Sequence, residues 1–244
     1  METTEKIIIY QVFTRLFGNQ NKTCRPNGSL EENGCGKMND FTKQALHEIK
    51  KLGATHIWYT GLIAHASQTD YTAYGIPKNH PSIVKGKAGS PYAIRDYYDI
   101  DPDLVEHVDK RMEEFEHLVT RSHECGLKVI MDFVPNHVAR QYHSLAKPAG
   151  VKDLGENDDC SQDFNPQNNF YYIPGQKLAG EIDLYDPEQG NYEEMPAKAT
   201  GNDRFDAWPN RNDWYETIKL NYGLDYLYHT GGCLLYTSPS PRDA

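Results

Sequence analysis

An acid, an amide and an imidazole follow one another closely in the stretch GLKVIMDFVPNHV, as Asp132, Asn136 and His137. These side chains can hold a ligand through hydrogen bonds, and the carboxylate and imidazole can also carry charge or protons. The apolar run at residues 129–131 predicts a parallel strand that is buried on both faces. Because ligands bind at the carboxyl ends of parallel strands, all three residues are candidate site residues. Taken singly, Asp132 as a turn cap and His137 as an ordinary loop histidine explain the same pattern.

Composition excludes some partners without naming a function. The 244 residues are 38% hydrophobic and 25% charged, which is ordinary usage for a globular protein. A formal net charge of -10 argues against nucleic acid or an anionic membrane as a partner, since both need clustered Lys and Arg. The 17 tyrosines leave neutral ligands with stackable surfaces open.

The amino-terminal stretch and the cysteines bear on the compartment. The apolar run at residues 7–9 is too short for a secretory signal, and no stretch reaches transmembrane length, so a cytoplasmic location is expected. The 5 cysteines lack C-x-x-C spacing, which implies neither a zinc site nor a disulfide framework. Free thiols are expected, although Cys24 and Cys35 could bridge in an oxidising compartment.

Residues 6–138 alternate strand and helix. Strands are predicted at 6–14 and 54–60, from runs rich in β-branched and aromatic residues, and a third within the stretch 126–138, on the apolar run 129–131. Helices are predicted from the N-cap Asp40 to Gly53 and from about Val108 to Gly126, on apolar residues at helical spacing. Loops are predicted at 15–38 and from 61 to about 103.

The connections favour a fold of the α/β class. Short helix-to-strand joins and long strand-to-helix loops are typical of a (β/α)8 TIM barrel, of which residues 1–137 supply the first three strands. A doubly wound nucleotide-binding sheet has the same alternation, but no Gly-rich phosphate loop follows the first strand. Residues 138–230 are polar and predict an inserted subdomain, with short strands within 169–174 and 216–222.

Four segments together resemble the α-amylase family, glycoside hydrolase family 13. IIIYQVFTRLF is similar to the family's first strand, and YAIRDYYDIDPDL resembles the loop after its second strand. DFVPNH matches the family's D-x-x-x-N-H motif, and NDWYETIKLNYG resembles the segment that closes the inserted subdomain B. The order and spacing of the four segments carry the resemblance, which covers roughly residues 6–225.

The resemblance implies roles for individual residues. Tyr92 would stack its ring on the sugar at the cleavage subsite, and His137 would hydrogen-bond a hydroxyl of that sugar. Asp132 would be structural, orienting an arginine beside the nucleophile. The alternative for Tyr92 is a loop aromatic that covers the barrel rim. The implied partner is an α-glucan oligosaccharide or polysaccharide.

Calcium is the one cofactor that the resemblance raises. In family members that bind calcium, the residue equivalent to Asn136 is one ligand among several oxygens. The closing segment commonly reads Q-P-D-L-N, whereas residues 216–221 read ETIKLN, which puts Lys219 where the aspartate stands. Because an ammonium group repels a cation, Lys219 argues against calcium and is expected to approach Asn136 instead.

The family's catalytic carboxylates are not found in this sequence. Retaining hydrolysis needs a nucleophile and a general acid about 5 Å apart, and no G-F-R-x-D-like motif is present, so the chain contributes no catalytic residue and is expected to be inactive. Residues 231–244 are interpreted as read-through of a sequencing adapter, because CLLYTSPSPRD can be written without mismatch as the translation of a transposase adapter. A disordered Pro- and Ser-rich terminus is the alternative.

The resemblance therefore implies an α-amylase-type hydrolase that cleaves α-1,4-glucans with retention, in carbohydrate metabolism. An α-glucanotransferase has the same motifs and differs in whether water or a sugar attacks the intermediate. A non-catalytic binding scaffold of the same fold is a further alternative, because fold alone does not fix function.

Overall fold

The computed structural model describes residues 6–226, which divide between two compact units. Unit 1 comprises residues 1–79, 86–133 and 144–146, and unit 2 comprises 80–85, 134–143 and 147–244, in each case as far as they are described. The proposed read-through segment 231–244 lies outside the described residues, and the subdomain boundary at 137 stays a prediction. No helix within residues 6–226 is long and apolar enough to cross a membrane.

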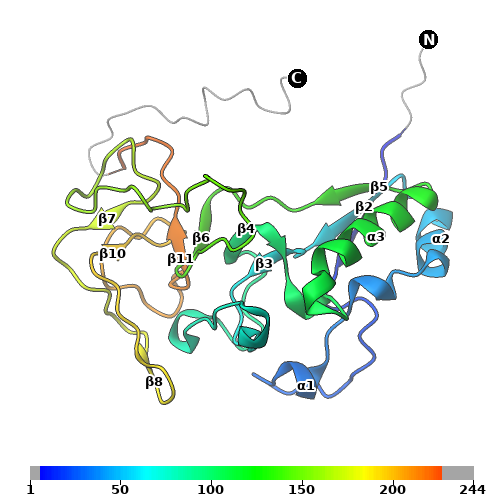
Figure 1. Ribbon diagram of the computed structural model, residues 1–244, viewed down its shortest axis with the longest axis horizontal. Coiled ribbons are helices and arrows are strands. Elements are labelled where there is room, and N and C mark those ends of the chain that lie inside the picture. The colour runs from blue at the N-terminus through cyan, green and yellow to red at the C-terminus, as the bar shows by residue number, and fades with distance from the viewer. Residues whose placement is uncertain (1–5, 227–244) are drawn as a thin grey trace, which may run out of the picture. The chain divides into compact units, whose positions relative to one another are not determined.

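Unit 1 is built on a parallel sheet of three strands in the order β1-β2-β5 (Figure 1). The strands are β1 (Ile9–Phe13), β2 (His56–Thr60) and β5 (Lys128–Met131), and Tyr59 of β2 lies opposite both Val12 and Met131. The three predicted strands are thus confirmed, while the described residues form no closed barrel. The strand β5 is half-buried rather than fully buried, because it lies at an edge of the sheet.

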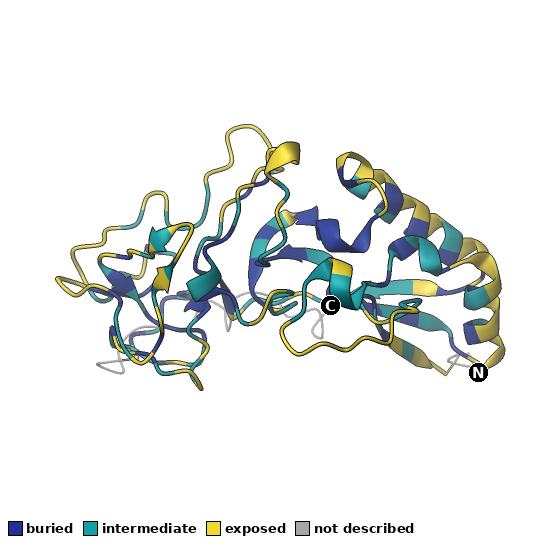
Figure 2. Cartoon of the chain, turned by 90° about the horizontal axis from the view of Figure 1, so that it is seen from below, coloured by how far each residue is buried: buried dark blue, intermediate teal, exposed yellow. Residues whose placement is uncertain are grey.

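Two amphipathic helices cover one face of this sheet, α2 (Lys43–Lys51) and α3 (Arg111–Glu124) (Figures 1 and 2). A third helix, α1 (Leu30–Asn33), lies in the segment predicted as a loop, and a capping box at the N-cap residue Ser29 begins it. Asp40 is not the N-cap of α2: Thr42 is, and its hydroxyl accepts a hydrogen bond from the amide of Ala45. Asp40 instead ends a 3₁₀ turn, where its carboxylate accepts from the amide of Lys37 at 2.6 Å.

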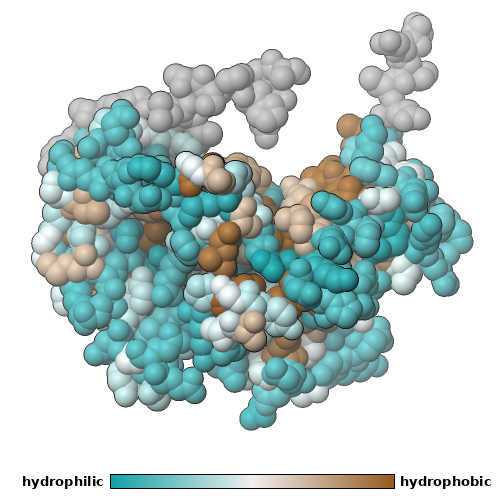
Figure 3. Space-filling view, in the orientation of Figure 1, coloured by the Kyte–Doolittle hydropathy of each residue, from teal (hydrophilic) through white to brown (hydrophobic). Residues whose placement is uncertain are grey.

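One apolar cluster fills the space between the sheet and the helices (Figure 2). Leu46 of α2, Ile57 of β2 and Leu118 of α3 are fully buried within it. Burial of such side chains stabilises a domain by roughly 1.5–3 kcal/mol each. Apolar surface remains exposed near the start of β1, where Ile7 is 66% exposed and Ile9 is 49% exposed (Figure 3).

The segment after β2 contains an antiparallel pair of strands that was not predicted from the sequence. The strands β3 (Ile63–His65) and β4 (Ile94–Ile100) pair antiparallel, with irregular register on both sides of Ala64. The prediction of a continuous loop here was wrong, because β4 reads IRDYYDI, whose aspartates and arginine conceal a strand. Five 3₁₀ turns also belong to the described chain, at Met38–Asp40, Thr72–Tyr74, Pro81–Ile83, Pro102–Leu104 and Val108–Lys110.

Unit 2 contains only short strand pairs within its described residues. The pairs are β6 (His137–Ala139) with β11 (Thr217–Lys219), β7 (Tyr172–Ile173) with β10 (Ala197–Lys198), and β8 (Tyr185–Asp186) with β9 (Gly190–Asn191), all antiparallel. The expected strands within 169–174 and 216–222 are confirmed. His137 begins a strand and does not lie in a turn, because pairing with β11 extends the backbone immediately after Pro135.

Candidate functional site

Asp132 directly follows β5 in unit 1, at the position predicted for a site residue. Its Oδ1 accepts a hydrogen bond from the indole nitrogen of Trp58, which β2 presents from the neighbouring strand. Its Oδ2 is buried and has no hydrogen-bond partner among the described residues. An unpaired buried carboxylate oxygen costs free energy, so this atom is a vacant acceptor for a donor such as a guanidinium.

Tyr92 lies in a turn that precedes β4, also in unit 1. The residue is 45% exposed, and its backbone amide donates to the hydroxyl of Ser90 at 3.3 Å. The turn thus fixes the backbone and leaves a large part of the ring accessible. An accessible ring of this kind can stack on the C–H face of a sugar.

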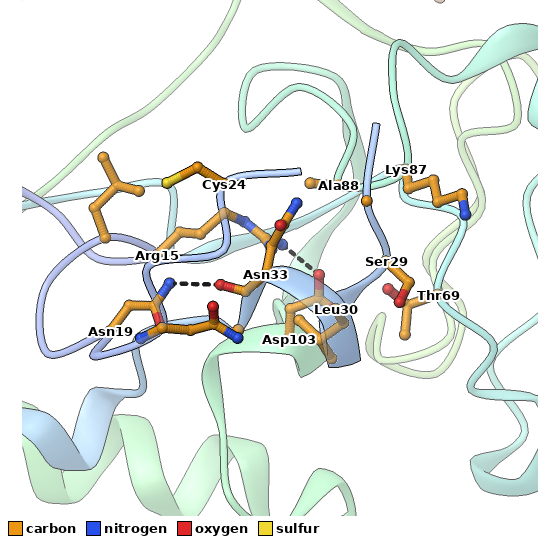
Figure 4. A pocket seen from close by; sticks show the side chains of 14 residues that line it. Arg15, Asn19, Cys24, Ser29, Leu30, Asn33, Thr69, Lys87, Ala88 and Asp103 are labelled. Carbon is orange, nitrogen blue, oxygen red and sulfur yellow. Dashed lines mark hydrogen bonds and ion pairs between the residues drawn. The ribbon is translucent and has the colours of Figure 1, made fainter. Parts of the chain in front are cut away.

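A cavity of about 350 Å³ lies among the loops of unit 1 that follow β1 and β4 (Figure 4). Arg15, just after β1, forms an ion pair with Asp103, which is also held by the hydroxyl of Tyr71 at 2.7 Å. Lys37 donates to the backbone carbonyl of Asp103 at 2.6 Å. Arg15 and Asp103 thus neutralise each other, while Lys87 adds an ammonium group to the lining of the cavity.

Close to this cavity, His65 and Asp101 form a buried pair with Nδ1 and Oδ2 2.7 Å apart. Burial alone lowers the pKa of His65, but the Asp101 carboxylate outweighs it and the pKa is raised. Burial acts in the opposite sense on Asp101, and the positive charges of His65 and Arg15 hold its pKa below the ordinary value. The ion pair links the end of β3, at His65, to the residue that follows β4, Asp101.

In unit 2, His137 is 6% exposed and packs beside the indole of Trp214, with ring centroids 5.2 Å apart. A Cβ added at Gly201 would lie 2.8 Å from Cβ and Cγ of His137, so only glycine leaves room for the imidazole there. Neither Trp214 nor Gly201 was identified from the sequence. Their contacts with His137 span more than sixty residues of chain, and no local pattern reports such a contact.

The predicted approach of Lys219 to Asn136 is confirmed. The ammonium of Lys219 lies 3.2 Å from Oδ1 of Asn136 and 2.5 Å from Oδ1 of Asp203. It also lies 5.1 Å from the centroid of the Tyr226 ring, a cation–π geometry. Although its side chain is only 6% exposed, the charge of Lys219 is therefore compensated.

These residues do not fit a calcium ion. Calcium requires six to eight oxygens, several of them anionic, and here a lysine ammonium binds the side-chain oxygen of Asn136. The carboxylate of Asp203 is paired with the same lysine. Within residues 6–226 no cluster of three His, Cys, Asp or Glu side chains is arranged to hold a metal.

A smaller cavity of about 190 Å³ in unit 2 is lined mainly by aromatic rings. Tyr171 meets Phe205 and Tyr226 edge-on, with centroids 5.2 Å and 5.7 Å away, and lies nearly parallel to Phe164 at 6.1 Å. Asp163 adds a carboxylate to the lining. Rings combined with a carboxylate are the groups that bind a sugar, through its C–H faces and its hydroxyls.

Comparison with known proteins gives one family match and several partial relatives. Residues 11–220 match the family model described as Alpha amylase, catalytic domain. Maltase A1 of Drosophila melanogaster is 24% identical over 232 residues, which cover 95% of this chain and 30% of that protein. The cyclomaltodextrin glucanotransferase of Bacillus licheniformis is 25% identical over 175 residues, which cover 68% of this chain and 22% of that enzyme.

Solved structures give a similar pattern of partial coverage. The crystal structure of an alpha-amylase from Lactobacillus plantarum is 28% identical, with a TM-score of 0.38, and the match covers 57% of this chain and 24% of that one. The chain thus spans less than a third of the length of each of these three relatives.

Proposed function

Because the chain belongs to the alpha-amylase catalytic-domain family, we propose that it is part of a glycoside hydrolase that cleaves α-1,4-linked glucans with retention of the anomeric configuration. The observation that carries the proposal is the D-x-x-x-N-H segment, whose Asp132 directly follows a parallel strand with one buried carboxylate oxygen unpartnered. Such an acceptor suits an arginine that helps to position a nucleophile.

The binding chemistry of the other site residues supports a sugar as the ligand. Tyr92 offers an accessible ring for stacking, and His137 offers a fixed imidazole for a hydroxyl. Neither residue can break a glycosidic bond, because that reaction requires a pair of carboxyl groups, one on each side of the bond. We therefore propose that the chain binds and positions glucan, and that the carboxylates for catalysis come from a part of the enzyme with no counterpart in this sequence.

Two assays test the proposal. The 244-residue chain is expected to release no reducing sugar from maltotriose or soluble starch above a mock purification. The longer enzyme of which the chain is proposed to be a part is expected to hydrolyse both, and proton NMR of the first product is expected to show the α-anomer. A β-anomer as first product, or turnover by the chain alone, would contradict the proposal.

A glucanotransferase is the second candidate, because the cyclomaltodextrin glucanotransferase of Bacillus licheniformis is 25% identical to the chain, close to the 24% of Maltase A1, although over a shorter stretch. The two candidates differ in whether water or a sugar hydroxyl takes the glycosyl group from the intermediate. Incubation of the whole enzyme with maltotriose separates them: longer or cyclic oligosaccharides indicate transfer, and glucose with maltose alone indicates hydrolysis.

A further inference from the structure

The orientation of the Asn136 amide is fixed by partners that leave no choice. Its Oδ1 faces the ammonium of Lys219 at 3.2 Å, and its Nδ2 faces the backbone carbonyl of Gly201 at 2.7 Å. An ammonium only donates hydrogen bonds and a carbonyl only accepts them. A flipped amide would place donor against donor and acceptor against acceptor, so the amide adopts this orientation alone.

The fixed amide then determines how the neighbouring histidine is protonated. Nδ2 of Asn136 has two hydrogens, one directed to Gly201 and the other to Nδ1 of His137, which lies 3.0 Å away. Nδ1 must therefore accept, and an accepting ring nitrogen carries no proton. A neutral imidazole with an unprotonated Nδ1 has its proton on Nε2.

The lysine that starts this chain of contacts is held rigidly. The strands β6 and β11 lie side by side (Figure 1). In this pair Lys219 lies directly opposite His137, and its backbone amide donates to the carbonyl of Ala199 at 2.9 Å. Asp203, 2.5 Å from the ammonium, and the Tyr226 ring hold its charged end. The ammonium therefore keeps its position without a bound metal.

We propose that Lys219 and Asn136 are positioning residues that fix His137 as the neutral tautomer with its proton on Nε2, so that the imidazole offers a hydrogen-bond donor to a sugar hydroxyl. The tautomer follows from the contacts inside unit 2 alone. The sugar as recipient rests on the proposed function. In this arrangement a lysine performs by hydrogen bonding the orienting task for which a bound cation would otherwise be needed.

Nitrogen NMR of the full chain labelled with ¹⁵N-histidine measures the tautomer directly. Two-bond proton–nitrogen correlations distinguish a protonated from an unprotonated ring nitrogen, and the variant His137→Gln identifies the His137 signals. The unsubstituted chain is expected to show an unprotonated Nδ1 and a protonated Nε2. A protonated Nδ1 in this chain would overturn the proposal.

Three substitutions separate positioning from simple structural support. Asn136→Asp puts an acceptor against Nδ1 and is expected to move the proton there, with little change in side-chain size. Lys219→Met removes one of the two groups that fix the Asn136 amide and is expected to admit a minor share of the Nδ1-protonated form, because the Gly201 carbonyl still favours the original orientation. Lys219→Arg keeps a donor and is expected to restore the Nε2 form. The control Lys177→Met removes an exposed ammonium paired with Glu193 and is expected to leave the His137 signals unchanged.

The outcomes are distinct from those that test the proposed function. An unchanged His137 spectrum in Asn136→Asp, whose size is conserved and whose fold is checked by circular dichroism, would overturn the proposal even if Lys219→Met failed to fold. A maltotriose titration of the same labelled chain is read separately. Absence of any response to maltotriose, with the tautomer as expected, would count against the sugar function and leave the positioning role intact.

Discussion

The two units of this chain are stabilised in different ways. Unit 1 has a parallel sheet, two amphipathic helices and an apolar cluster that includes Leu46, Ile57 and Leu118. Unit 2, in its described part, has strand pairs of two or three residues and a smaller apolar cluster around Ile173 and Leu178. Much of its order comes from polar side chains that hold the backbone.

Buried charge contributes to the order of unit 2. Arg140 has a side chain that is 0% exposed, and its Nη1 lies 2.6 Å from Oε1 of Glu194. The same guanidinium donates to the backbone carbonyls of Tyr215 and Lys198. One side chain thus joins three segments that are distant in sequence.

Loss of the Arg140 guanidinium tests this comparison most strongly. Arg140→Met leaves Glu194 buried without its guanidinium partner, and breaking a buried pair in this way costs about 3–5 kcal/mol. Urea unfolding followed by tryptophan fluorescence measures it, with Trp58 replaced by Phe so that Trp208 and Trp214 of unit 2 report. The exposed pair partner Lys177, replaced by Met, is the control, and equal midpoints for the two variants would remove the distinction between the units.

A cavity in the apolar core tests the other side of the comparison. Leu118→Ala empties a fully buried position on α3 and is expected to cost about 3 kcal/mol. Trp58 is the reporter for unit 1 when Trp208 and Trp214 are replaced by Phe. Met112→Ala on the same helix, where the side chain is 41% exposed, is the control. If the urea midpoint reported by Trp208 and Trp214 shifts as far as the one reported by Trp58, the two units unfold together. The units would then differ in architecture but not in stability.

The same contrast explains what could be predicted from the sequence. The strands β1, β2 and β5 were predicted because continuous apolar and β-branched runs report burial locally. The antiparallel pair β3–β4 was missed, because polar residues interrupt the hydrophobic pattern of β4 and the register of the pair is irregular. The contact between Lys219 and Asn136 was predicted only because the family's motifs aligned the two positions.

Other parts of the candidate site had no signal of that kind. Trp58, which donates to Asp132 across 74 residues, lies in a strand whose pattern reports only burial. Trp214 and Gly201 pack on His137 from separate loops of unit 2. Contacts between distant segments form only when the chain folds. Residue type and spacing therefore predicted Asp132, Asn136 and His137 as site residues, but not the side chains that pack on them.

A dependence on pH is expected in unit 1 from the buried pair of His65 and Asp101. The raised pKa of His65 means that the folded state holds a proton which the unfolded state releases above its ordinary value of 6.5. The contribution is therefore fully present below that pH and is lost as the pH rises through the folded value. The lowered pKa of Asp101 acts oppositely, and its contribution is lost as the pH falls through the folded value.

Arg15, Asp103 and Arg95 are other charged groups that interact with this pair, and they contribute to the size of the effect. Urea midpoints measured with Trp58 between neutral and alkaline pH are expected to fall in the unsubstituted chain. They are expected to fall much less in His65→Gln, which removes the titrating ring. Identical slopes in the two proteins would show that the pair does not contribute to the pH dependence.

Calcium is expected to have the smallest effect of all, because Lys219 already supplies the positive charge beside Asn136. A site with a Kd of about 10 µM would stabilise the folded state by about 2.7 kcal/mol in 1 mM calcium, an increase easily seen in a urea midpoint. No shift is expected for either set of tryptophan reporters, and calorimetric titration is expected to show no binding heat. Lys219→Ala tests whether the ammonium itself excludes the ion: calcium binding that appears only in this variant would show that it does. Tight calcium binding by the unsubstituted chain would contradict the prediction, and would show that a metal stabilises the loops of unit 2 together with lysine and arginine.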